Sequence, residues 1–175
     1  MAVETLTIVS AIRPGHEESV RSVLGSFKEP DASPFAEVPG THVARFVVMN
    51  RLGTGDPTSR RRLRPTRLLF SAVVDGPAEA WLWGLFEKEG PVFEEVWHHC
   101  VGWPDGSDST SRSRWLLDQR LTTTHGVVAH DATVAEIRRG LALRNALRDV
   151  AAEPAAATAA ELRAAYRRAM SRAGR

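Results

Sequence analysis

Four polar residues interrupt strand-like patterns that are otherwise apolar: Arg45, Ser71, Asp75 and His125. An arginine beside a carboxylate can orient and polarise a small-molecule substrate, and a histidine can exchange protons with that substrate near neutral pH. If residues 42–50 and 68–75 form paired strands, Arg45 and Asp75 should lie diagonally within reach of an ion pair. The sequence therefore predicts a catalytic pocket built from Arg45, Asp75 and His125. The alternative interpretation is a structural salt bridge in an interface.

A second candidate group is the segment His98-His99-Cys100. Successive residues of a helix lie about 100° apart, so His99 should border the apolar arc near Val96 while His98 faces solvent. We predict that His99 is buried and acts as an acid–base residue or a heme ligand, or is a core histidine bonded to a backbone carbonyl. Cys100 lies in the same arc and is predicted to be a packing residue with a raised pKa. Histidines at the ends of predicted elements are interpreted as caps or surface groups: His16, His42 and His130.

The elements that must position these residues follow from apolar periodicity. Alternation with a period of two predicts strands at 5–12, 42–50, 68–75 and 121–130. Helical spacing predicts one helix carrying Val20, Val23 and Leu24, and a second that begins at Pro77, is interrupted at Gly90-Pro91 and resumes over 92–100. This order is typical of a ferredoxin-like βαββαβ fold of the α+β class, with an antiparallel sheet and both helices on one face.

The remaining segments are predicted as loops or terminal helices. The proline-containing stretch 29–40, the arginine-rich stretch 60–67 and the polar stretch 105–114 are expected to be loops, the second of them mobile and at the surface. Capping boxes at Thr133/Glu136 and Thr158/Glu161 predict a helix over 134–150 and a further helix near the C-terminus. We expect a ferredoxin-like domain at 1–150 and a C-terminal helical extension at 151–175.

The two faces of the predicted sheet differ in composition. Positions facing the helices are uniformly apolar, as an antiparallel sheet with one covered face requires. The opposite face is too apolar for water and too polar for an ordinary core, so we expect a second subunit to cover it, in a homodimer that encloses a cavity. The residues of this mixed face are Thr7, Val9, Arg45, Val47, Ser71, Val73, Asp75, His125 and Val127.

Composition limits the remaining function classes. The chain has 175 residues, is 43% hydrophobic and has a net charge of +2, so nucleic acid is an unlikely partner and the arginine-rich stretch is its only candidate site. No segment reaches the roughly 20 apolar residues of a membrane span, and the N-terminus lacks a leader pattern. With a single cysteine, these features predict a cytoplasmic protein with no membrane partner. Arginine supplies 21 of the 23 basic residues, which is typical of a bacterial coding bias.

The order of elements over roughly residues 4–130 resembles the dimeric α/β-barrel superfamily. This superfamily includes antibiotic-biosynthesis monooxygenases, heme-degrading monooxygenases and, in duplicated form, dye-decolorising peroxidases and chlorite dismutases. Locally, Val92-Phe93 followed by Trp97-His98-His99 resembles the helix of heme-degrading monooxygenases that carries the axial histidine, downstream of a tryptophan such as Trp81 or Trp83. Gly90-Pro91 and Thr7 depart from that pattern, because those enzymes place an asparagine where Thr7 stands. Segments at 41–46, 68–70, 75–76, 97–100 and 102–104 also resemble a less characterised bacterial group found near peroxidase-like proteins.

The resemblance and the polar residues together predict a small-molecule enzyme, an oxygenase or cyclase acting on a hydrophobic metabolite in an enclosed pocket. In this hypothesis Arg45 and Asp75 orient the substrate and His125 or His99 exchanges protons. The alternatives are a non-catalytic domain that binds a ligand or docks a partner, and a heme-binding protein with His99 as ligand. Motifs of serine hydrolases, zincins, phosphate loops and dinucleotide sites are missing from the sequence.

Overall fold

A computed structural model of the chain describes residues 3–27, 33–53, 60–122, 130–152 and 158–173. Internal contacts divide the chain into two compact units, residues 1–131 and 132–175. The sequence-based division after residue 150 lies inside a helix of the second unit, near its end. Within the described residues the fold is mixed α and β, with a three-stranded antiparallel sheet, five α-helices and a short 3-10 helix.

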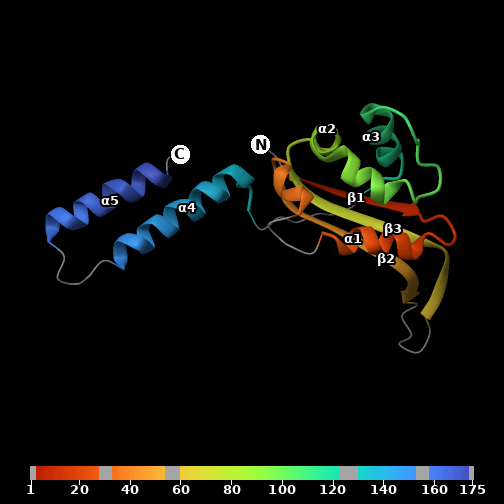
Figure 1. Ribbon diagram of the computed structural model, residues 1–175, viewed down its shortest axis with the longest axis horizontal. Helices are drawn as coiled ribbons and strands as arrows, with labels where there is room; N and C mark the ends of the chain where they lie inside the picture. Colours follow the sequence, from red (N-terminus) through yellow and green to blue (C-terminus); the bar gives the residue numbers. More distant parts are fainter. Residues whose placement is uncertain (1–2, 28–32, 54–59, 123–129, 153–157, 174–175) are drawn as a thin grey trace. The chain divides into compact units, whose positions relative to one another are not determined.

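The sheet of the first unit has the strand order β1-β3-β2 (Figure 1). β3 lies in the centre and pairs with both neighbours. Both pairings are antiparallel, as the sequence predicts. The bounds of the strands are β1 (Val3–Ala11), β2 (Thr41–Gly53) and β3 (Arg60–Asp75).

The other edge of β1 is contacted by residues 119–121. The backbone N–H of Val9 donates to the carbonyl of Gln119 at 3.2 Å, and that of Leu121 donates to the carbonyl of Thr7 at 2.8 Å. These bonds continue the antiparallel pattern at the point where the fourth strand is predicted to begin. Most of that predicted strand, 121–130, falls on residues 123–129, which lie outside the described part of the chain.

The core lies between one face of the sheet and the helices α1 (Glu17–Gly25) and α2 (Ala78–Trp97). Val20 of α1 and Leu85 and Trp97 of α2 are fully buried. The 3-10 helix η2 (Pro34–Glu37) lies in the stretch predicted as a loop, and its Phe35 stacks on Phe70 at a centroid distance of 5.8 Å. The predicted helix-facing positions of β1 and β3 are confirmed, because none is more than 1% exposed: Leu6, Ile8, Leu68, Phe70, Ala72 and Val74.

α2 bends where the sequence predicts an interruption. Glu89 has non-helical backbone angles, φ −126° and ψ 22°, two residues before Pro91. Proline has no N–H to donate and its ring clashes with the preceding turn, which accounts for the kink. The helix then continues to Trp97, so that Phe93 and Trp97 enter the core from its second half.

The prediction of a polar loop at 105–114 is wrong for most of that stretch, because α3 (Ser109–Asp118) begins within it. Asp108 caps this helix, with its carboxylate accepting a hydrogen bond from the Ser111 N–H at 2.7 Å. Ser113 and Leu116, three residues apart, are both fully buried. The cap and the narrow buried stripe stabilise a helix whose composition alone is typical of a loop.

The predicted surface loop at 60–67 is also wrong, because these residues are the first part of β3. Arg51 pairs with Arg62 and Gly53 with Arg60, which extends the β2–β3 ladder beyond the body of the sheet. The register skips residues 63–66 between the pairs Met49–Arg67 and Arg51–Arg62, which is a large bulge. Strand pairing satisfies the backbone hydrogen bonds while the side chains of Arg61, Arg62 and Arg64 are exposed, so a charged sequence is compatible with a strand.

The second unit consists of α4 (Val134–Ala151) and α5 (Ala159–Ala173). Both predicted capping boxes are confirmed. The Thr133 hydroxyl accepts a hydrogen bond from the Glu136 N–H at 3.2 Å, and the Glu136 carboxylate accepts one from the Thr133 N–H at 2.7 Å. Thr158 and Glu161 form the same pair of bonds at the start of α5. None of the described helices has the length and apolar character needed to cross a membrane.

Candidate functional site

The sheet face that points away from α1 and α2 carries an ordered pattern of side chains, and we call it the open face. The strand register places Thr7, Ser71 and Arg45 in one row across the three strands. Apolar residues dominate the rows on either side, and the central polar row therefore lies between two hydrophobic strips. The flanking rows are Thr5–Val73–Val43 and Val9–Leu69–Val47.

The described chain leaves much of the open face accessible. Val43 is 57% exposed and Val47 is 41% exposed. Arg45 is also exposed, between these two valines along β2. The open face thus combines exposed valines with Arg45, and Arg67 stands two residues beyond Leu69 on the same side of β3. An exposed apolar surface with cations beside it suits an apolar ligand with an anionic group.

The predicted ion pair between Arg45 and Asp75 is not the pair that the register forms. Arg45 lies opposite Ser71, and Asp75 lies four residues farther along β3, about 13 Å away at roughly 3.3 Å per residue. The partner of Asp75 is His42, whose Nε2 lies 2.8 Å from the carboxylate Oδ1. The two side chains are only 8% and 10% exposed, so this pair is largely shielded from water.

An irregularity at the start of β2 brings His42 to Asp75. Thr41 pairs with Val74 and Val43 pairs with Val73, so His42 is the extra residue of a bulge. Bulges redirect side chains in this way near functional sites. The bulge depends on non-local pairing, and sequence analysis therefore treated His42 as a strand-end residue and missed its partner.

The His42–Asp75 pair is held firmly by its surroundings. The Asp75 N–H donates to the carbonyl of Gly40 at 2.8 Å. Gly40 has a φ of 76°, and a Cβ at that position would lie 3.0 Å from the Asp75 Cβ, so only glycine fits without strain. Trp81 Nε1 donates to the Thr41 hydroxyl at 2.9 Å next to His42.

This geometry suits proton transfer. A carboxylate that engages one imidazole nitrogen fixes the orientation and tautomer of the ring, which leaves the other nitrogen to accept or donate a proton. In His42 the working nitrogen would be Nδ1. His130 lies beside the ring, at a centroid distance of 5.9 Å.

His99 is buried, as predicted, but its partner is another histidine. It is 9% exposed, and its Nδ1 lies 2.9 Å from Nδ1 of His16. Burial lowers the pKa of His99, and the nearby charges of His98, His16 and Arg13 lower it further. His99 is therefore adapted to remain neutral.

The surroundings of His99 bear on the heme hypothesis. A neutral imidazole is a suitable axial ligand, and a hydrogen bond at its other nitrogen is a common feature of such ligands. However, the ring of His98 lies 3.8 Å from that of His99 between centroids, and His16 engages Nδ1. These contacts are those of a packed histidine pair, and heme binding stays a prediction.

The other predicted site residues have simpler outcomes. His125 lies outside the described residues. Cys100 is fully buried, and burial raises the pKa of its thiol to about 12, which confirms its interpretation as a packing residue. Among the described residues, no three histidine, cysteine or acidic side chains gather where they could hold a metal ion.

The bulge in β3 faces a cavity of about 450 Å³ between the arginine-rich stretch and the β1–α1 turn. Arg62 and Arg64 line it on one side and Glu17 on the other. Backbone hydrogen bonds of Glu17 itself lower the pKa of this carboxyl, and the Thr66 hydroxyl and Arg62 add to the effect. Glu17 is thus an anion in a cavity that two arginines share.

Searches of protein-family models, of characterised proteins and of solved structures found nothing that this chain matches.

Proposed function

We propose that the open face binds a hydrophobic small molecule with an anionic end, and that the His42–Asp75 pair transfers a proton to or from it. The observation that carries this proposal is the order of side chains along the sheet. Arg45 marks one end, Val43 and Val73 form an apolar strip, and Asp75 holds His42 at the other end. A ligand of roughly the 13 Å between Arg45 and Asp75 would contact all three parts.

The alternation of β3 supports a common side for these groups. Val74 is fully buried beneath the helices, so Val73 and Asp75 point to the opposite side, which Ser71 shares. The Arg45 guanidinium offers two parallel hydrogen bonds to a carboxylate or sulfonate. The hydroxyls of Ser71 and Thr7 can bind further oxygen atoms of the ligand.

The proposal includes a ferredoxin-like layer and a second copy of the chain. The bonds of residues 119–121 to the free edge of β1 support the strand order that this fold requires. The exposure of Val43 and Val47 supports a homodimer in which two open faces enclose the ligand. A cytoplasmic location belongs to the same proposal and is supported by Cys100, a free buried thiol.

The reaction class proposed is an oxygenation by molecular oxygen without a cofactor, or a cyclisation. In the oxygenation one atom of O2 enters the substrate and the other leaves as water with two hydrogens from the substrate. Both reactions begin with proton removal next to an activating group and need a site that excludes water. Arg45 would stabilise the anionic end of the substrate, and His42 would take the proton. A binding module without catalysis would use the same open face but would not depend on His42, which separates the two functions.

Binding is tested with anilinonaphthalene sulfonate, an apolar fluorophore with one anionic group. We expect saturable binding that Arg45→Gln weakens about tenfold or more, since a charged hydrogen bond contributes about 1.5–3 kcal/mol. Arg114→Gln is the matched control, because Arg114 is an exposed arginine of α3 and lies outside the open face. Equal affinity in Arg45→Gln and the unmodified protein would contradict binding at the open face.

Catalysis is tested with a panel of hydrophobic carboxylic acids, followed by mass spectrometry. Oxygenation adds an oxygen atom to a substrate, whereas cyclisation changes only its retention time or its water content. His42→Gln should abolish turnover while fluorophore binding at Arg45 persists. Turnover that is equal in His42→Gln would remove His42 from the reaction, and loss of both signals would indicate misfolding.

A further inference from the structure

The two helices of the second unit contact each other through small side chains. Ala146 of α4 and Ala165 and Ala169 of α5 are each 6% to 8% exposed. Two isolated helices that touch through alanines bury little apolar surface, and such a pair is only marginally stable in water. Most of the large apolar side chains of this unit are exposed instead: Leu141, Leu147, Leu162, Tyr166 and Met170 are between 39% and 48% accessible.

Four of these five exposed side chains gather on one side of the helical hairpin, whereas Leu141 lies roughly 140° around α4 from Ala146 in the opposite direction. At about 100° per residue, Leu143 and Leu147 lie roughly 60–100° around α4 from Ala146. Leu162 and Tyr166 lie at the same angles around α5 from Ala165. α5 runs back along α4 (Figure 1), so the same rotation turns both stripes to the same side. We call this side the hairpin face, made of Leu143, Leu147, Leu162, Tyr166 and Met170.

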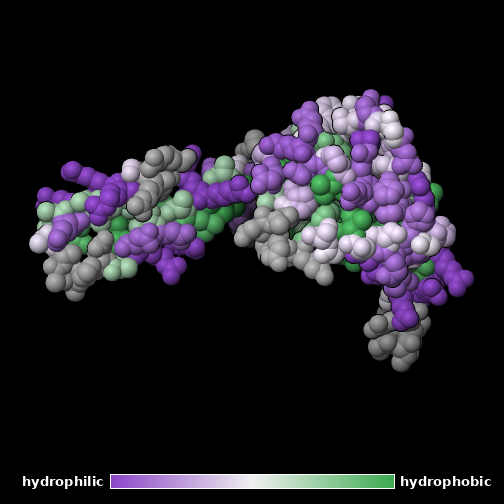
Figure 2. Space-filling view, in the orientation of Figure 1, coloured by the Kyte–Doolittle hydropathy of each residue, from purple (hydrophilic) through white to green (hydrophobic). Residues whose placement is uncertain are grey.

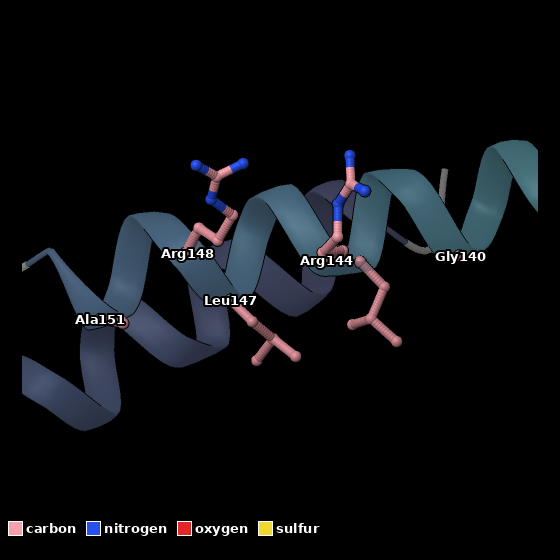
Figure 3. Close-up of a pocket in the computed structure, with 6 residues that line it drawn as sticks. Gly140, Arg144, Leu147, Arg148 and Ala151 are labelled. Carbon is pink, nitrogen blue, oxygen red and sulfur yellow. The ribbon is translucent and has the colours of Figure 1, made fainter.

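Arginines border the hairpin face on both helices. Arg144 and Arg148 follow the apolar stripe of α4, and Arg163 and Arg167 follow that of α5 in the same helical positions. Figure 3 shows Arg144 and Arg148 extending together from one side of α4, while Leu147 points to another. Figure 2 shows hydrophobic residues between hydrophilic ones along this unit.

A shallow groove runs along α4 between these two kinds of side chain. It has a volume of about 420 Å³. Its floor includes Gly140, which has no side chain, and Ala151, whose side chain is a methyl group. A neighbouring backbone can therefore approach closely, as at many helix–helix contacts. Leu143 and Leu147 line it together with Arg144 and Arg148.

Charge decides which occupant suits this surface. Residues 132–175 contain nine arginines and four acidic residues, a net charge of +5, whereas residues 1–131 carry a net charge of −3. A second copy of the hairpin would bring arginine borders against arginine borders, which is repulsive. The complementary occupant is apolar along one stripe and acidic along its edges.

We propose that the hairpin face binds an amphipathic helix with acidic edges, supplied by a partner protein, as the third helix of a bundle. The partner's apolar residues would pack on Leu147 and Tyr166, and its carboxylates would pair with Arg144 and Arg148. This contact would bury the side chains that the alanine interface leaves exposed. It is independent of the small-molecule site proposed for the first unit.

The test uses the full chain and a labelled helical peptide with leucines on one face and glutamates along both edges, followed by fluorescence anisotropy. We expect saturable binding that weakens with added salt, and no binding of a matched peptide in which the glutamates are lysines. The double variant Arg144→Glu, Arg148→Glu should bind the acidic peptide at least about tenfold more weakly. The control variant Arg138→Glu, Arg168→Glu has the same net charge but changes the other edges of the helices, and should bind like the unmodified protein.

Three results would overturn the proposal. Equal weakening in the two double variants would show that only net charge matters. Binding to vesicles of phosphatidylglycerol but not to the acidic peptide would assign the hairpin face to a lipid surface. The absence of any peptide binding, with helix content unchanged by circular dichroism, would show that the rest of the chain or a second copy covers the face.

Discussion

The two faces of the sheet are built from the same strands and differ in composition and exposure. Phe70 and Ser71 are neighbours on β3, yet the first is fully buried against Trp97 and the second lies in the polar row of the open face. The helix-packed face contains aromatic and branched residues that stabilise the fold. The open face alternates polar and apolar rows, and it is the surface that we propose for ligand binding. Residues adjacent in sequence on one strand therefore belong to surfaces of different composition.

The largest expected effect is a loss of stability from a substitution on the helix-packed face. Phe70→Ala should reduce the free energy of unfolding by about 4 kcal/mol, because Phe70 is fully buried among four other aromatic rings. Val47→Ala on the open face should change it by less than about 0.5 kcal/mol when the protein is dilute. Urea unfolding measures both values. A cost of Val47→Ala that grows with protein concentration would show that a second copy covers the open face.

The next effect concerns the contact that fixes Asp75. Gly40→Ala should destabilise the protein by about 2 kcal/mol, because its positive φ disfavours alanine and the new Cβ meets the Asp75 Cβ at 3.0 Å. Gly15→Ala shares the positive φ but has no atom within 4 Å, so it carries the backbone strain alone. Thermal unfolding of the two variants measures both losses of stability, and their difference is the contribution of the close contact with Asp75. Equal destabilisation would mean that the approach of Gly40 to Asp75 is unimportant.

A smaller effect depends on pH and belongs to the helix-packed side. Because the pKa of His99 is lowered in the folded protein, the unfolded chain binds a proton more readily below the ordinary value of 6.5. Stability should therefore fall as the pH falls below about 6.5, with a slope of at most about 1.4 kcal/mol per pH unit from this group. His99→Gln should flatten the slope of stability against pH. Urea unfolding between pH 7 and pH 5 measures this slope, and a change of ~1 kcal/mol in the free energy of unfolding can be resolved.

Heme binding is expected to have the smallest effect on the fold. Binding at His99 would place a cofactor outside the open face and would add a third surface to the comparison of the two sheet faces. If hemin binds specifically, His99→Ala should lose the saturable Soret band and His98→Ala should retain it, since His99 is the more buried of the two. Optical titration gives the result. Identical, non-saturating uptake by both variants would remove heme from consideration.

Local patterns predicted much of this structure. The period of two placed Leu6 and Phe70 in the core, and the four-residue capping boxes placed the starts of α4 and α5, because each signal depends on neighbours in sequence. α3 was missed because its stabilising features, the Asp108 cap and the burial of Ser113, are few among polar residues. Helix and strand formation were thus most predictable where apolar residues repeat.

The candidate site was predicted only in part. Arg45, Ser71 and Asp75 were identified as unusual on their strands, and the register does place Arg45 and Ser71 side by side. The partner of Asp75 was not identified, because His42 reaches it through a bulge that forms only when β2 pairs with β3. The pairing of Thr41 with Val74 is non-local and leaves no trace in the periodicity of either segment. The arginine-rich part of β3 is instead held as a strand by a hairpin with residues 51–53, and its charged composition hides this short ladder.

The capping boxes at Thr133 and Thr158 make the start of each helix in the second unit independent of the sheet. Each helix of the second unit begins on a signal contained within four residues, and the first of these signals stands just after the division between the two units. A segment with such self-contained start points can be lengthened, lost or transferred to another protein without shifting the register of any strand. Related chains are therefore expected to vary most from residue 132 onward, while keeping β1, β2 and β3 in step.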